Sequence, residues 1–180
     1  TNKFAVTPSA CNKLFKREFV EDTRFPVGLW YEDFEFTTKK LMLTDKISVI
    51  HKSFYHCHCR EVSTMMNDNS QKNLDIITVL NNLSEFVEEK GMTNEYADTL
   101  EYLYIEHILI TTVNRLKQQN NTEKNSIIKQ MVAEIKKRYP KFYKNKVFKE
   151  MPKNRRIIAI LNFLGLSSVS KLIFDIKAKI

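Results

Sequence analysis

Apolar residues recur every three or four positions through the second half of the chain. This spacing predicts helices that bury one face, because an α-helix has about 3.6 residues per turn. Three such stripes run through residues 74–87, 96–113 and 127–139, and two shorter helices are predicted over residues 154–164 and 167–180. Gly91 is expected to end the first helix, since glycine readily adopts the positive φ of a C-cap, and Pro140 is expected to stop the third. Residues 70–180 are therefore expected to be all-helical.

The first third of the chain has a mixed pattern. It predicts helices over residues 10–22 and 32–44, followed by strands over residues 47–51 and 54–60. The two predicted strands are rich in β-branched and aromatic residues and are separated by a short polar break, as in a hairpin. Pro26 and Gly28 interrupt helical structure between the two helices and predict a loop there. The predicted fold class is therefore α+β and mostly helical.

A polar segment over residues 65–71 separates the two patterns. The periodicity changes there from two residues to about 3.6, which predicts a boundary between two domains. We therefore expect a first domain over residues 1–69, made of short helices and a strand pair, and an all-α second domain over residues 70–180.

Charge is distributed unevenly along the 180 residues, whose formal net charge is +8. Residues 1–116 contain 13 basic and 17 acidic residues, whereas residues 117–180 contain 16 basic and 4 acidic residues. Basic segments commonly meet anionic lipid, nucleic acid or acidic proteins. Within residues 141–180 the lysines are interleaved with apolar residues. This pattern fits either helices packed on the preceding ones or an amphipathic anchor at a lipid surface.

Composition also bears on where the protein resides. No apolar run reaches the roughly 20 residues that a membrane-spanning helix needs. The chain has three cysteines, an odd number that makes a poor disulfide framework, and no secretory signal opens it. A cytoplasmic location is therefore expected. The chain begins with Thr1 and not with methionine, so a fragment of a longer polypeptide is expected as well.

Two motifs could carry chemistry. The pair Glu32-Asp33 follows a glycine-containing loop, where carboxylates can complement the dipole of a helix start or serve as a base that takes a proton from a hydroxyl group. Residues 56–59 read HCHC and suggest a metal site. In a strand, however, alternate side chains point to opposite faces, so the four could not close around one zinc ion. We expect free side chains there and no metal site.

Three short blocks of residues occur in order within the first third of the chain. Residues 11–18 read CNKLFKRE, residues 25–33 read FPVGLWYED, and residues 54–63 read FYHCHCREVS. These blocks resemble the W-N-K-L-[YF]-[KR]-R-E, F-P-x-G-x-x-Y-E-D and Y-Y-x-x-R-x-R-E-G-S segments of bacterial family 2 glycosyltransferases, and the spacing between them fits as well. Residues 70–180 resemble the family only loosely, as a helical extension with a basic, apolar end.

The resemblance implies a GT-A fold, a doubly wound α/β sheet of which this chain would supply only the C-terminal end. In that family a DxD motif in the N-terminal half holds Mg2+ or Mn2+ with the nucleotide sugar. This chain contains no DxD. The full enzyme is therefore expected to use Mg2+ or Mn2+, and this chain is expected to bind no metal or cofactor by itself.

The resemblance also implies catalytic and binding roles for individual residues. Asp33 matches the general base that deprotonates the acceptor hydroxyl, and Glu32 would position Asp33 or the acceptor. Asn12 and Lys13 match a segment that lines the substrate site.

Arg60 and Ser63 match a loop near the diphosphate of the donor. Three residues depart from the family pattern: Cys11 replaces tryptophan, His58 replaces arginine and Val62 replaces glycine. The first departure bears on the acceptor pocket, the second on a phosphate contact, and the third on the loop after the strand. None of them touches Asp33.

Two functions from different classes remain open. The first is an inverting glycosyltransferase that moves a sugar from a nucleotide sugar to a saccharide or lipid-linked acceptor in cell-surface polysaccharide synthesis. The isolated chain would be inactive, because the nucleotide-binding half is absent. The alternative is a non-catalytic, helical, basic module that binds a membrane surface or nucleic acid. For the transferase we expect no nucleic-acid partner, and a cytoplasmic location that includes the inner face of the cell membrane.

Overall fold

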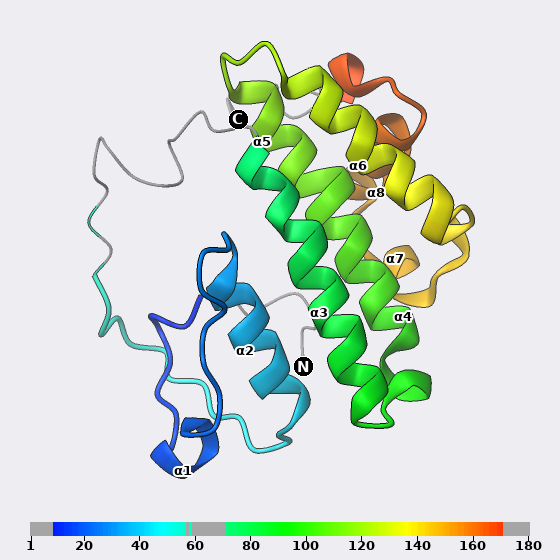
Figure 1. Ribbon diagram of the computed structural model, residues 1–180. Coiled ribbons are helices and arrows are strands. Elements are labelled where there is room, and N and C mark those ends of the chain that lie inside the picture. The colour runs from blue at the N-terminus through cyan, green and yellow to red at the C-terminus, as the bar shows by residue number, and fades with distance from the viewer. Residues whose placement is uncertain (1–8, 57, 59–70, 171–180) are drawn as a thin grey trace. The chain divides into compact units, whose positions relative to one another are not determined.

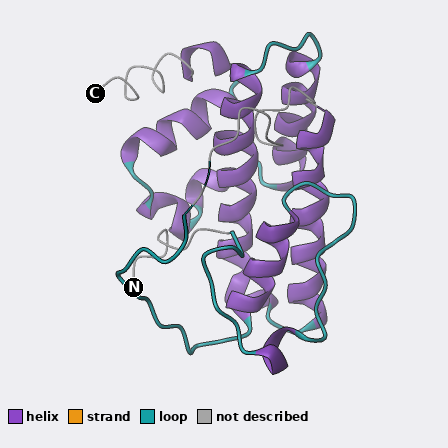
Figure 2. Ribbon diagram, turned by 90° about the vertical axis from the view of Figure 1, so that its left-hand side faces the viewer, coloured by secondary structure: helices purple, strands orange, loops and turns teal. Residues whose placement is uncertain are grey.

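A computed structural model of the chain describes residues 9–56, 58 and 71–170. It divides into two compact units, Thr1–Asn67 (unit 1) and Asp68–Ile180 (unit 2). Helix accounts for 66% of the structure, so the prediction of a mostly helical fold is confirmed. Figure 1 shows the helices in chain order, and Figure 2 shows that no strand occurs in the described ranges.

The described part of unit 1 contains two helices, α1 (Arg17–Val20) and α2 (Glu32–Met42), joined by a loop. Helix α2 was expected over residues 32–44 and forms over nearly that range. Its first turn carries three carboxylates and its last turn two lysines, so both ends complement the helix dipole. Gly28 in the preceding loop has a φ of +80°, where a residue with a side chain would be strained.

The helix predicted over residues 10–22 is wrong except for its four residues Arg17–Val20. Residues 9–12 form a turn, in which the hydroxyl of Ser9 accepts a bond from the backbone N–H of Cys11, at 3.2 Å. The ammonium of Lys13 donates to the carbonyl oxygen of Ser9, at 2.6 Å. Side chains thus satisfy the backbone locally, and such bonds compete with a helix whose first turn is costly to form.

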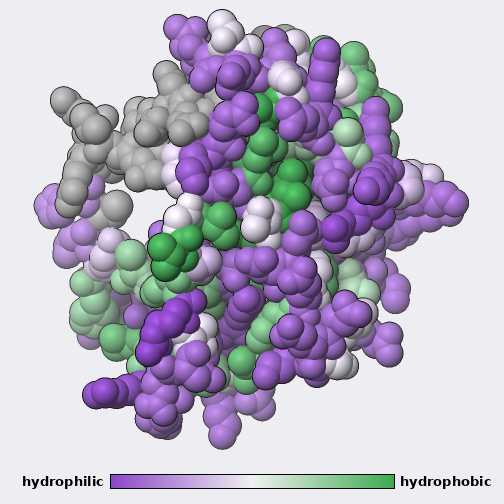
Figure 3. Space-filling model, viewed as in Figure 1, coloured by the Kyte–Doolittle hydropathy of each residue, from purple (hydrophilic) through white to green (hydrophobic). Residues whose placement is uncertain are grey.

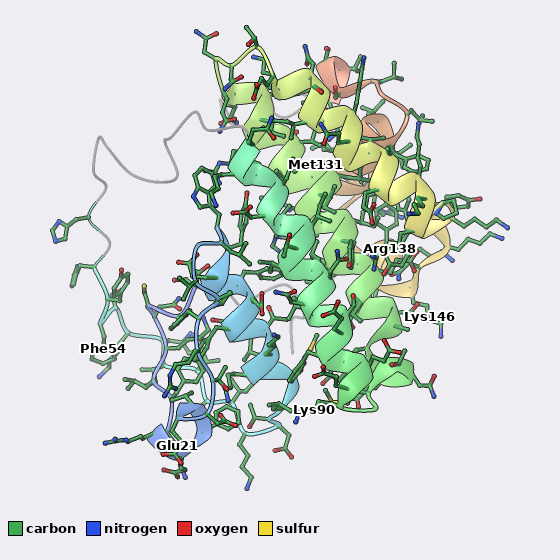
Figure 4. All side chains as sticks on the ribbon, in the orientation of Figure 1. Glu21, Phe54, Lys90, Met131, Arg138 and Lys146 are labelled. Atoms are coloured by element: carbon green, nitrogen blue, oxygen red, sulfur yellow. The ribbon has the colours of Figure 1, made fainter. Side chains whose placement is uncertain are left out.

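The strand pair predicted over residues 47–51 and 54–60 is also wrong for the residues that the structure describes. Residues 45–56 run as an irregular segment, and the apolar side chains in it are largely exposed. Phe54, labelled in Figure 4, is 74% exposed. A high β-propensity reflects how well a side chain suits a packed sheet, and no described segment of the chain provides a sheet for it. Residues 57, 59 and 60 lie outside the described residues.

Unit 2 is all-helical, as predicted for the range from residue 70 onward that the structure describes. Its elements are η2 (Gln71–Leu74), α3 (Asp75–Glu89), α4 (Thr93–Tyr104), η3 (Ile105–Thr112), α5 (Val113–Gln118), α6 (Lys124–Arg138), η4 (Phe142–Lys144), α7 (Lys146–Glu150) and α8 (Lys153–Phe163). Figure 1 shows α3, the continuous run α4–η3–α5, and α6 lying side by side, and each packs on the next. Among the described helices, none is long and apolar enough to cross a membrane.

The core of unit 2 lies around η3, which packs against α3, α6 and α8. Its largest fully buried side chains include Ile76, Leu80, Leu83, Tyr104, Ile108, Leu109, Leu116, Ile127 and Met131. The predicted apolar stripe of α6 is buried at four of its five positions, Tyr139 being the half-buried one. The stripe of α3 is partly shifted, since Ile76 and Val79 are buried while Leu74 and Ile77 are only half-buried.

Helix ends follow the predicted signals. Gly91 has a φ of +68°, and the N–H of Met92 donates to the carbonyl oxygen of Val87, at 2.9 Å, which closes α3. Helix α6 ends at Arg138, two residues before Pro140. Both expected stops are confirmed.

The apolar pattern did not predict the π-helix η3, nor the short helices η4 and α7. A π-helix has i→i+5 hydrogen bonds, is rare, and appears frequently at functional sites. The amide of Asn162, a buried residue of α8, donates to the carbonyl oxygen of Leu109, at 2.5 Å. The hydroxyl of Ser170 in turn donates to the amide oxygen of Asn162, at 2.5 Å. Helix α8 therefore donates a side-chain hydrogen bond to the backbone of the π-helix.

Candidate functional site

The candidate site lies at the start of α2, where the Glu32-Asp33 pair opens the helix. Tyr31 precedes the pair with a φ of +68°, the left-handed region, which a bulky aromatic residue seldom adopts. Its carbonyl oxygen still accepts the first helical bond, from the N–H of Glu35 at 3.1 Å. Strained backbone of this kind often occurs at functional positions. The turn directs the chain sharply into α2 and places both carboxylates in its first turn.

The two carboxylates differ in their access to solvent. Glu32 is exposed, whereas Asp33 is half-buried. Glu35, two positions after Asp33, is buried and pairs with Lys39, with 2.7 Å between its Oε1 and the ammonium Nζ. Glu35 therefore has a structural partner. Asp33 keeps a side chain that a substrate hydroxyl could reach.

An aromatic cluster ties the first two sequence blocks to α2. The ring of Phe25 stacks on that of Phe36, with the centroids 4.4 Å apart, and Phe15 meets Phe36 edge-on at 5.7 Å. Such pairs contribute about 0.5–1.5 kcal/mol each beyond their burial. Phe36 therefore fixes residues 11–18 and the loop over residues 25–33 to one side of α2.

Asn12 and Lys13 lie in the first of these blocks. The ammonium of Lys13 donates to the side-chain oxygen of Asn12, at 2.8 Å, and to the carbonyl oxygen of Ser9. Burial lowers the pKa of Lys13, while the charges of Asp33 and Cys11 act in the opposite direction and raise it. Asp33 is thus near enough to Lys13 for the two charges to interact. The structure brings together Asn12, Lys13 and Asp33.

A second cation, Lys40, supports the site from the other end of α2. Its side chain is 4% exposed and donates to the carbonyl oxygen of Phe19, at 2.6 Å. It also lies 3.3 Å from a carboxylate oxygen of Asp22 and 4.9 Å from the centroid of the Phe19 ring. Hydrogen bonds from Thr23 and Lys40 lower the pKa of Asp22. Lys40 therefore joins the end of α1 to α2.

Not every predicted site residue can be placed. Arg60 and Ser63 lie outside the described residues, as do Cys57 and Cys59 of the HCHC segment. Within the described part of the chain, no group of three or more His, Cys, Asp or Glu side chains could hold a metal ion. The metal-binding DxD implied by the resemblance does not occur in these 180 residues.

Two residues of the site were missed by the sequence analysis. The apolar face of the second predicted helix contains Lys40 between Phe36 and Leu43, and this interruption was a signal for a buried, paired lysine. The left-handed backbone of Tyr31 left no signal, because tyrosine is not a residue type that favours that region.

The arrangement is suited to proton transfer to a carboxylate. Asp33 is fixed by the first turn of α2 and lies within the electrostatic reach of the Lys13 ammonium. A carboxylate that is held in place and partly accessible can accept a proton from a hydroxyl group that binds beside it.

Comparisons with known proteins identified no protein similar to this chain. No protein-family model matches the chain, and neither a curated protein nor a solved structure matches it.

Proposed function

We propose that this chain is the C-terminal part of an inverting family 2 glycosyltransferase in which Asp33 is the general base. One observation carries the proposal. The two blocks that resemble the family and that the structure describes, residues 11–18 and 25–33, meet through Phe36 on α2, and Lys13 lies within electrostatic reach of Asp33. A helical module without catalysis would need neither this order of blocks nor this convergence.

The proposed reaction is a single displacement. The oxygen of the acceptor hydroxyl attacks the anomeric carbon of the donor sugar, and the bond from that carbon to the diphosphate oxygen breaks. The electron pair of that bond leaves with the nucleoside diphosphate, and the hydroxyl proton passes to the carboxylate of Asp33. Attack from the face opposite the leaving group inverts the anomeric carbon. Positioning of the hydroxyl beside its base is expected to supply much of the acceleration.

The remaining residues have supporting roles in the proposal. Glu32 orients Asp33 or a second hydroxyl of the acceptor, and Asn12 with Lys13 lines the acceptor side of the site. Arg60 and Ser63 contact the diphosphate. Donor binding, with Mg2+ or Mn2+, belongs to a nucleotide-binding half outside this chain.

The proposal also covers location and partners. The full enzyme acts on the cytoplasmic side, at the inner face of the cell membrane, with a nucleotide sugar as donor and a saccharide or lipid-linked molecule as acceptor. This chain by itself lacks the donor site. Calorimetry with nucleotide sugars is therefore expected to show no micromolar binding to it, and a micromolar signal would contradict that part of the proposal.

A second candidate function is a non-catalytic basic module. The observation that favours it is the accumulation of charge from the end of α6 to the start of α8, where residues 136–156 hold ten Lys and Arg and one acidic residue, Glu150. Arg138 and Lys146, labelled in Figure 4, lie at the same end of unit 2. The face in Figure 3 shows this end covered by hydrophilic side chains. Such a surface suits an anionic partner whether or not unit 1 is catalytic.

Sugar transfer by the full-length enzyme tests the proposal. The Asp33→Asn variant is expected to keep its fold and to lose roughly 100- to 10,000-fold in turnover, the usual worth of a positioned base. Asp45→Asn, a change at an exposed carboxylate of unit 1, is the matched control and should leave turnover unchanged. Wild-type turnover in Asp33→Asn would refute the assignment. Activity of the full enzyme with no nucleotide sugar would refute the reaction class.

A further inference from the structure

Helix α8 is apolar on both of its faces. Ile158, Ala159 and Asn162 are buried and pack toward the core of unit 2. On the opposite side, Ile157 and Ile160 are 40% and 39% exposed. The solvent side of a helix in a globular protein is ordinarily polar. The outer side of α8 therefore departs from the usual pattern.

The exposed apolar residues continue beyond the end of α8. Leu164 is 61% exposed, and Leu166 and Val169, after the turn at Gly165, are 49% and 48% exposed. Ile157, Ile160 and Leu164 are spaced three and four residues apart, so they share one side of the helix. We call Ile157, Ile160, Leu164, Leu166 and Val169 the outer apolar face. Exposed apolar groups in such number on one short stretch commonly mark a binding surface.

Basic residues lie beside this face, and the stretch that carries it contains no acidic residue. Lys153 is exposed and lies one turn before Ile157 on the same side of α8. The ammonium of Lys136, on α6, lies 5.5 Å from the ring centroid of Phe163 in α8. Across residues 151–170 the sequence has no Asp or Glu. The partner that covers the outer apolar face must therefore tolerate or prefer positive charge.

One nearby cation does not contribute to this border. The guanidinium of Arg155 pairs with the carboxylate of Glu106 in η3. This ion pair fixes the start of α8 to the π-helix. Lysine side chains are long and flexible, so their ammonium groups can reach a headgroup layer while the helix lies flat.

We propose that the outer apolar face of α8 binds the surface of an anionic lipid bilayer. The aliphatic side chains enter the boundary between headgroups and acyl chains, and Lys153 and Lys136 meet the phosphates of anionic lipids. A helix with apolar residues on its outer side and lysines at its border lies in the plane of the interface. Basic residues near the bilayer add electrostatic attraction that falls off within a Debye length.

The chemistry of the face favours lipid over two other occupants. A second copy of the chain would place two sets of lysines against each other, and like charges that face each other disfavour association. Nucleic acid is recognised by cationic and aromatic groups that meet phosphates and stack on bases, whereas this face is aliphatic. Of these three occupants, only an anionic bilayer offers both an apolar layer and negative charge.

The inference does not depend on Asp33 or on the transfer of a sugar. It locates in unit 2 the surface that would hold a transferase beside a lipid-linked acceptor. Vesicle binding and turnover are separate measurements, so the failure of one proposal can be distinguished from the failure of the other.

Vesicle co-sedimentation of the purified chain tests the inference. The chain should pellet with phosphatidylcholine vesicles that contain phosphatidylglycerol, should pellet much less with phosphatidylcholine alone, and should be released as sodium chloride rises. The double variant Ile160→Gln, Leu164→Gln should lose binding by about tenfold or more, because it removes apolar area that lipid would bury. Both positions are exposed, so circular dichroism and the unfolding transition should stay close to wild type.

Two matched controls separate this face from general stickiness. Leu14→Gln with Val27→Gln removes two aliphatic side chains of unit 1 that are each 99% exposed, and it should leave vesicle binding unchanged. Lys153→Glu should weaken binding to anionic vesicles, whereas Lys90→Glu, at the exposed end of α3, should weaken it much less.

Four results would overturn the inference. The first two are equal binding to neutral and anionic vesicles, and no binding to either. The third is a loss of vesicle binding in the unit 1 control as large as in the α8 double variant. The fourth is an α8 double variant that loses a dimer seen by light scattering but binds vesicles as the wild type does. The last result would assign the outer apolar face to a second copy of the chain. Binding to an oligonucleotide but to no vesicle would assign the basic border to nucleic acid.

Discussion

The burial of His107 leads us to expect that the stability of unit 2 depends on pH. This residue lies in the π-helix η3, next to the Glu106–Arg155 ion pair. Burial lowers the pKa of His107 from 6.5 to about 4. The imidazole is therefore neutral in the folded state at neutral pH, and unfolding restores its ordinary pKa.

The sign and size of the effect follow from linkage. Between the unfolded pKa of 6.5 and the folded pKa of about 4, the unfolded state binds a proton that the folded state does not. The stabilising contribution is fully present above pH 6.5 and is lost as the pH falls toward 4. At about 1.4 kcal/mol per pKa unit, the loss is about 3 kcal/mol. His107 keeps some solvent exposure, so this figure is an upper limit.

Urea unfolding followed by circular dichroism tests this prediction. The free energy of unfolding of the wild type should fall more steeply between pH 6.5 and 4 than that of the His107→Gln variant. The carboxylates titrate equally in both proteins, so the difference between the two slopes isolates His107. The exposed His51 provides the control, because His51→Gln should keep the wild-type slope. Equal slopes in wild type and His107→Gln would refute the reasoning.

Three further changes are expected to alter stability. Asn145→Ala removes the cap bond from the N–H of Phe148, at 2.9 Å, and the amide bonds to the carbonyl of Asp98 and the carboxylate of Glu101. The free energy of unfolding of unit 2 in urea should therefore fall by about 2–3 kcal/mol, whereas the control Asn120→Ala, at an exposed position, should change it very little. Lys40→Met leaves the carbonyl of Phe19 without its ammonium partner and should lower the unfolding midpoint of unit 1. The fluorescence of Trp30, the only tryptophan, reports this midpoint. A midpoint as unchanged as that of the control Lys46→Met, at an exposed position, would contradict the role assigned to Lys40. Gly91→Ala should lower the free energy of unfolding by about 1 kcal/mol. The cause is backbone strain alone, because φ is +68° and a Cβ would meet no atom within 4 Å. An unchanged free energy in urea unfolding would show that the backbone of the cap relaxes.

The helices of unit 2 could be predicted because their apolar spacing is a local property of the sequence. Gly91 and Pro140 also act locally, so the ends of α3 and α6 could be predicted too. The π-helix could not, because its carbonyl at Leu109 is satisfied by Asn162, which lies 53 positions along the chain. The burial of Asn145 similarly depends on α4, a contact that no spacing rule contains.

The predicted strand pair shows that a local pattern can also indicate an element that does not form. Residues such as Val49 and Ile50 favour strands, but a strand forms only when another strand pairs with it. Val49 is 72% exposed and Ile50 is 65% exposed, so the β-branched side chains that indicated a strand are not packed in the described segment. The early helix failed for a different reason, since the Ser9 hydroxyl accepts from the N–H of Cys11 and the Lys13 ammonium donates to the carbonyl of Ser9, which satisfies the backbone in a turn.

The site residues stay a prediction. The order of the sequence blocks singled out Asn12, Lys13 and Asp33; in the structure the ammonium of Lys13 bonds to Asn12 and interacts electrostatically with Asp33. The means by which they meet could not be predicted. Phe36 joins the blocks through ring contacts with residues 11 and 21 positions earlier, and tertiary contacts of this kind leave no periodic trace in the sequence.

The most direct test of the account is the single-turnover rate of sugar transfer by the full-length enzyme at saturating donor and acceptor. If Asp33 is the general base, Asp33→Asn should lower this rate roughly 100- to 10,000-fold while the dissociation constant of the donor stays unchanged. Glu32→Gln, one position earlier, should lower it less. A rate in Asp33→Asn within a factor of about two of wild type would contradict the central claim, because the chemical step would then not need this carboxylate.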